Sequence, residues 1–68
     1  MKIYNNVEET ITEWSRQLVA KHGIQFRIYS DKKETLSRWS IGLTNIYGKP
    51  FNIKENINET LNNWSKLF

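Results

Sequence analysis

The sequence predicts an α+β fold: a two-layer sandwich in which two helices cover one face of a three-stranded antiparallel meander. Two patterns carry this prediction. The middle of the chain alternates between apolar and polar residues, as a sheet buried on one side does, and both ends carry apolar residues at helical spacing. At 68 residues the chain makes one small domain, residues 1–68, in the order helix, three strands, helix.

The alternating stretch covers residues 24–54, nearly half of the chain. We expect strands at residues 24–29, 36–45 and 51–54, because neighbouring side chains of a strand point to opposite faces. Both helices would then pack on the apolar face and leave the polar face open. The apolar face would collect Ile24, Phe26, Ile28, Trp39, Ile41, Leu43, Phe51 and Ile53.

A helix is expected on either side of the sheet, one at residues 6–22 and one from Asn56 to the C-terminus. Asn5 or Asn6, and Asn56, suit the N-cap position, because an asparagine side chain can accept from the free amides of a first turn. Gly23 follows the first helix as a typical stop. The apolar stripes are Val7, Ile11, Trp14 and Leu18 in the first helix, and Ile57, Leu61, Trp64 and Phe68 in the second.

A repeat of 25 residues offers an alternative fold. The pattern Glu-Thr-(Ile/Leu)-x-x-Trp-Ser begins at Glu9, at Glu34 and again at Glu59. Read literally, the chain would be three strand–helix units with a small parallel sheet. Residues 32–46 would then form a helix instead of a strand.

Three features favour the meander over the repeat fold. Gly42 would lie inside the middle helix, at a cost of about 1 kcal/mol relative to alanine. Ile41 would face solvent, and residues 39–46 are rich in side chains that favour strands. We therefore prefer the meander and keep the repeat fold as the alternative.

The polar face of the predicted sheet is the candidate binding site. It would bind either a partner protein or a nucleic acid, because cations attract phosphates and an exposed tyrosine can stack on an unpaired base. The candidates on this face are Arg27, Tyr29, Arg38, Ser40, Thr44 and Lys54. The candidates in the adjoining loops are Lys32, Lys33, Tyr47 and Lys49.

The order of elements is similar to that of double-stranded-RNA-binding domains, over most of the chain and in topology alone. That family carries a basic cluster at the start of its second helix, which grips phosphates across a groove. Here the position reads Glu55-Asn-Ile-Asn-Glu59, which is acidic and polar. The resemblance therefore does not extend to the RNA-binding motif. Some small phage-encoded inhibitors of host defence share the same order of elements.

Composition excludes several kinds of site. The chain has no cysteine and one histidine, so it has neither a disulfide framework nor a zinc site, and we expect no metal and no cofactor. His22 could serve as a general base, but its place in a last helical turn favours a role beside the helix dipole. No phosphate-binding glycine loop and no nucleophile motif occurs, so we do not expect an enzyme.

The expected function is a small non-enzymatic binding module, a protein-binding inhibitor or adaptor of the kind that phages and mobile elements encode. Its partner would be a host or phage protein. The alternative is a nucleic-acid-binding regulator that uses Arg27, Arg38 and Lys54 with Tyr29. No apolar run approaches the roughly 20 residues of a membrane span, and no signal peptide is recognisable. We expect a cytoplasmic protein without membrane contact, either a monomer or a homodimer.

Overall fold

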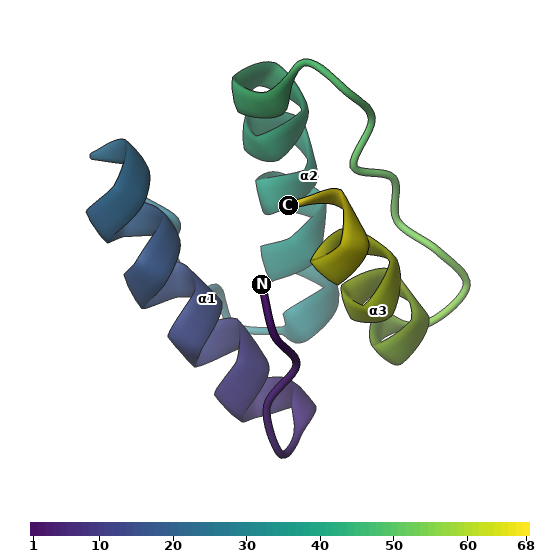
Figure 1. Cartoon of the computed structure of the whole chain (residues 1–68). Helices are drawn as coiled ribbons and strands as arrows, with labels where there is room; N and C mark the ends of the chain where they lie inside the picture. The colour runs from purple at the N-terminus through teal and green to yellow at the C-terminus, as the bar shows by residue number, and fades with distance from the viewer.

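Three α-helices make up the fold, and no strand is present. The computed structural model describes residues 1–68, with α1 at Val7–His22, α2 at Lys32–Tyr47 and α3 at Ile57–Leu67 (Figure 1). The predicted α+β sandwich is therefore wrong, and the chain is all-helical. The helices expected at the two ends are present as α1 and α3, whereas the second predicted strand, residues 36–45, lies inside α2.

The sequence around α2 satisfies both ends of a helix. Asp31 caps the N-terminus, because its carboxylate accepts from the Glu34 N–H at 2.7 Å. Gly48 ends the helix in the left-handed conformation, with φ of 70°, and its N–H donates to the carbonyl of Thr44. These residues form a helix although they alternate between apolar and polar, because a helix places three large apolar side chains on one buried face: Leu36, Trp39 and Leu43.

The repeat divides the chain into three structural units: unit 1 (residues 1–23), unit 2 (residues 24–48) and unit 3 (residues 49–68). Each unit consists of a short non-helical segment followed by one helix. The alternative fold is thus matched in its middle helix, but its parallel sheet is absent. The segments at residues 24–29 and 51–54, the other predicted strands, pair with no strand.

Side chains of each helix hold the preceding segment and take over hydrogen bonds that a sheet would have made. A buried threonine hydroxyl accepts from a backbone N–H six residues earlier, and a buried tryptophan Nε1 donates to a carbonyl twelve residues earlier. The threonine bonds join Thr10 to Tyr4 (2.9 Å), Thr35 to Tyr29 (2.8 Å) and Thr60 to Lys54 (2.9 Å). The tryptophan bonds join Trp14 to Lys2 (2.9 Å), Trp39 to Arg27 (2.9 Å) and Trp64 to Asn52 (3.0 Å).

The three units close into a ring, because each helix contacts the segment of the next unit and the last helix contacts the first segment. This closure brings the two termini close together at the centre of Figure 1. The bonds that join the units run from Ser15 to the Phe26 carbonyl (2.6 Å), from Ser40 to the Phe51 carbonyl, and from the Met1 ammonium to the Ser65 carbonyl (3.3 Å).

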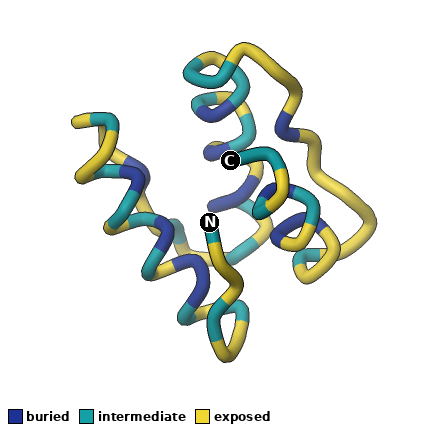
Figure 2. The backbone as a smooth tube through the Cα atoms, viewed as in Figure 1, coloured by how far each residue is buried: buried dark blue, intermediate teal, exposed yellow.

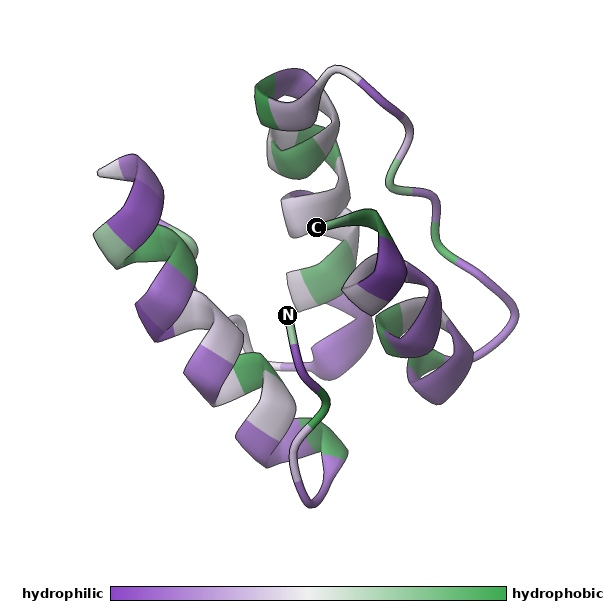
Figure 3. Cartoon of the chain, in the orientation of Figure 1, coloured by the Kyte–Doolittle hydropathy of each residue, from purple (hydrophilic) through white to green (hydrophobic).

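The core lies inside this ring, and the buried positions face inward from all three helices (Figure 2). Hydropathy follows the same division, with apolar residues on the inner helix faces and polar residues outside (Figure 3). Trp14, Trp39 and Trp64 are all at most 2% exposed, so the expected placement of each on a buried apolar face is confirmed. Phe26 meets Trp39 edge-on at 5.8 Å, and Phe51 meets Trp64 in the same way at 5.7 Å.

The whole chain measures 25 × 22 × 21 Å. None of its helices combines the length and the apolar character that crossing a bilayer requires.

Candidate binding surface

Because no sheet is present, the predicted site residues do not share one sheet face. Ser40 and Thr44 serve the fold: the Ser40 hydroxyl donates to the carbonyl of Phe51, and the Thr44 hydroxyl accepts from the N–H of Phe51 at 3.0 Å. Tyr47 packs inside the ring, with its ring centre 5.4 Å from that of Phe51. These three side chains are therefore occupied by contacts within the chain.

The predicted lysines do not gather in one place. Lys32 forms an ion pair with Glu8 across the junction of units 1 and 2. Lys33 and Lys54 line the next junction, between units 2 and 3. Lys49 is exposed in the loop before α3. The remaining candidates, Arg27, Tyr29 and Arg38, all line one groove beside α2.

We call this feature the arginine groove; it has a volume of about 240 Å³ and lies between α2 and the segment that precedes it. The Arg38 guanidinium stacks on the Tyr29 ring, 4.8 Å from its centre, and pairs with the Glu34 carboxylate at 3.2 Å. Arg27 is exposed. The walls combine these cations with apolar and amide side chains: Ile24, Arg27, Tyr29, Arg38, Asn45 and Ile46.

Gly42 lines the arginine groove and adds no side chain to it. The repeat places Gln17 at the equivalent position of α1, where its Nε2 donates to the hydroxyl of Tyr4 at 2.8 Å. In α3 the equivalent residue is Leu67, which packs against the core. Units 1 and 3 have no corresponding groove. Unit 2 thus departs from its two sister units at this surface.

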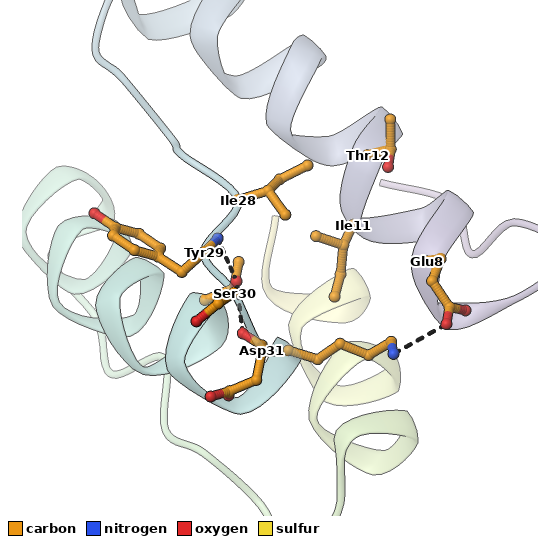
Figure 4. Close-up of a pocket in the computed structure, with 9 residues that line it drawn as sticks. Glu8, Ile11, Thr12, Ile28, Tyr29, Ser30 and Asp31 are labelled. Atoms are coloured by element: carbon orange, nitrogen blue, oxygen red, sulfur yellow. Dashed lines mark hydrogen bonds and ion pairs between the residues drawn. The ribbon is translucent and has the colours of Figure 1, made fainter.

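A second opening, which we call the junction groove, lies between α1 and unit 2 and has a volume of about 320 Å³. Figure 4 shows Ile11 and Ile28 facing each other across it, with the ion pair of Glu8 and Lys32 at one end. The two charged atoms are 2.9 Å apart. Because Lys32 donates a hydrogen bond to it and adds a favourable charge, the Glu8 carboxyl has a pKa lowered from its ordinary value.

Unit 2 also exposes more apolar surface than its sister units. Ile41 is 69% exposed, at a position where the repeat has Arg16 and Lys66. Ile24 and Ile28 are each about half exposed beside the two grooves. Ile24 and Ile28 therefore add exposed apolar surface to the walls of the two grooves.

His22 contributes to packing between units 1 and 2. Its Nε2 lies 3.0 Å from the hydroxyl of Tyr47, and the two rings meet edge-on at 5.5 Å. No group of three or more His, Cys, Asp or Glu side chains is placed to hold a metal ion.

Comparison of the chain with protein-family models, with curated proteins and with solved structures found no match.

Sequence reasoning missed Gly42, Ile24, Asn45 and Ile46 as groove residues. The repeat contained a signal for Gly42. Aligning the three copies puts Gly42 beside Gln17 and Leu67, which shows a missing side chain in the middle copy.

Proposed function

We propose that this chain is a non-enzymatic protein-binding module, an inhibitor or adaptor whose arginine groove holds an acidic segment of a partner protein through one aliphatic side chain. The observation that carries the proposal is the break in the repeat at Gly42. The equivalent positions in units 1 and 3 hold Gln17 and Leu67. A side chain therefore occupies this position in two units and is absent from it in unit 2. A leucine-like side chain from a partner would complete unit 2 as Leu67 completes unit 3.

The positive charges at the groove indicate that the partner segment is negatively charged. Arg27 and Arg38 both line it. Residues 24–54 carry six basic and two acidic side chains. Arginine at a groove rim can bind carboxylates with two parallel hydrogen bonds, which fixes orientation and partner choice.

The apolar walls favour a protein over a nucleic acid. Ile24 and Ile46 line the groove, and Ile41 extends the apolar surface along α2. Only Tyr29 could stack on a base, and the Arg38 guanidinium already lies over its ring. Aliphatic side chains give a phosphate backbone nothing to bind, whereas they suit the core of a protein interface.

The absence of cysteine suits a reducing compartment such as the cytoplasm, where we place the protein.

Selection from a displayed library of random dodecapeptides tests the proposal. The expected peptides carry aspartate or glutamate around a leucine or isoleucine. Binding should weaken at least about tenfold, or ~1.4 kcal/mol, in Arg38→Glu and in Gly42→Leu. Arg16→Glu is the matched control, because Arg16 is also an exposed arginine paired with a glutamate of its own helix.

Two results would overturn the proposal. One is a set of peptides that bind Gly42→Leu as tightly as the unchanged protein. The other is tight, salt-sensitive binding of labelled single-stranded DNA or duplex RNA that Arg27→Glu abolishes, which would show a nucleic-acid-binding protein instead.

A further inference from the structure

We infer that the junction groove is a second anchor point for the same partner segment and takes a branched aliphatic side chain, isoleucine or valine. This inference rests on the proposed function, because it concerns the same partner and the adjoining surface. Three observations carry it: the equivalence of the three junctions, the branched aliphatic residue that one of them lacks, and the wall shared by the two grooves.

The ring has three junctions of the same construction. At each one, the first turns of a helix meet the residues that lead into the next helix. The junction of units 1 and 2 holds a groove of about 320 Å³, whereas the other two hold about 90 Å³ and about 40 Å³. The larger volume is therefore specific to the junction of units 1 and 2, since the other two junctions have the same construction and smaller grooves.

One position of the repeat has a branched aliphatic residue at the two narrow junctions and a lysine at the wide one. Val7 and Ile57 occupy it at the two narrow junctions, where they are half-buried and pack against the core. At the wide junction the position holds Lys32, whose side chain reaches Glu8 instead of packing inward. The chain thus supplies a branched aliphatic side chain to two junctions and none to the third.

The walls of the junction groove suit the missing side chain. Ile11 is buried at its base and Ile28 is 52% exposed on the opposite side (Figure 4). A partner's isoleucine or valine would cover Ile28 and complete the junction as Val7 and Ile57 do elsewhere. Burying such surface is favourable in proportion to the apolar area removed from water.

The two grooves adjoin each other. Tyr29 lines both, and the segment from Ile24 to Asp31 passes between them. A partner segment with an aliphatic side chain over Gly42 therefore lies beside the junction groove. We expect its second aliphatic side chain, isoleucine or valine, to enter there.

Lys32→Ile tests the inference, because it would fill the junction groove from within as Ile57 fills its own junction. Lys33→Ile is the matched control, since it removes the same charge one residue further along and outside this groove. The probes are the acidic peptides recovered by the library selection, and versions in which each aliphatic residue is replaced by alanine. Isothermal titration calorimetry gives the dissociation constants, and heteronuclear NMR spectra confirm that each variant is folded.

The expected result is a loss of about tenfold or more in Lys32→Ile and less than about twofold in Lys33→Ile. In Lys32→Ile the alanine replacement of the second aliphatic residue should have no further effect, because both changes remove one contact.

Binding that Lys32→Ile leaves within twofold, while Gly42→Leu and Arg38→Glu still weaken it, would overturn this inference and leave the proposed function standing. Failure of Gly42→Leu and Arg38→Glu to weaken binding, or recovery of no peptide at all, would overturn both.

Discussion

Replacement of Gly42 by alanine should stabilise the protein. Glycine in a helix interior is less favourable than alanine by roughly 0.5–1 kcal/mol, because its backbone loses more freedom on folding. A Cβ built at Gly42 would lie 3.8 Å from Cε1 of Phe26, an ordinary van der Waals contact, and would approach no other neighbouring atom within 4 Å. Since no clash opposes the gain, we expect about 1 kcal/mol, which corresponds to a rise in Tm of roughly 4–8 °C for a domain of this size.

The chain contains its own controls for this substitution. Gly23 and Gly48 have φ of 69° and 70°, the left-handed region that a Cβ disfavours by roughly 1–2 kcal/mol. Nothing lies within 4 Å of a Cβ at either position, so the whole cost there is conformational. Alanine at Gly23 or Gly48 should therefore lower the Tm, where the same change at Gly42 raises it. Thermal unfolding followed by circular dichroism compares the three variants, and an unchanged or lower Tm for Gly42→Ala would refute a helix through this residue.

Two further predictions concern the bonds that hold unit 2 in place. Thr35→Val should lower the free energy of unfolding by about 1–3 kcal/mol in urea titrations, because it leaves the Tyr29 N–H without the acceptor it has at 2.8 Å; the exposed Thr12→Val is the control, and equal losses in both would contradict the role of Thr35. The pKa of Glu8 is depressed in the folded state, so its pair with Lys32 adds stability above the ordinary carboxyl value of 4.5 and loses it as pH falls through the lower folded value. Unfolding measured from about pH 6 down to about pH 3 should therefore show a steeper loss of stability in the unchanged protein than in Glu8→Gln, and parallel curves would count against the pair.

The helices at the two ends could be predicted from the sequence because every local signal agreed. Asn6 and Asn56 cap them by accepting from the N–H of the residue three positions on, both at 2.8 Å. The apolar residues of these helices also fit only one period. Trp14 and Trp64 then enter the core as their spacing indicated.

The sheet was predicted because the alternation in residues 24–29 is real but has another cause. The Tyr29 N–H and the Arg27 carbonyl are bound by the side chains of Thr35 and Trp39, and not by a neighbouring strand. Alternation alone cannot distinguish a strand in a sheet from an extended segment held by side chains.

Gly42 and Ile41 were the residues that argued against a middle helix, and both mark the proposed binding surface. Gly42 opens the arginine groove, and Ile41 is left exposed beside it. Local rules are expected to fail at functional sites, because such residues are kept for binding and not for folding. Arg27, Tyr29 and Arg38 line one groove although the sheet that was to group them is absent.

The arrangement of the groove on one unit of a threefold repeat allows a direct test of the central claim, that the departure of unit 2 from the repeat creates the binding site. The measurement is a heteronuclear NMR titration of the protein with an acidic peptide recovered by selection. The amides of residues 27–48 have equivalents at residues 2–23 of unit 1, which serve as internal controls. We predict chemical-shift changes at Arg27, Tyr29 and Gly42 and none at their equivalents Lys2, Tyr4 and Gln17. Equal changes in both units, or changes away from α2, would contradict the claim.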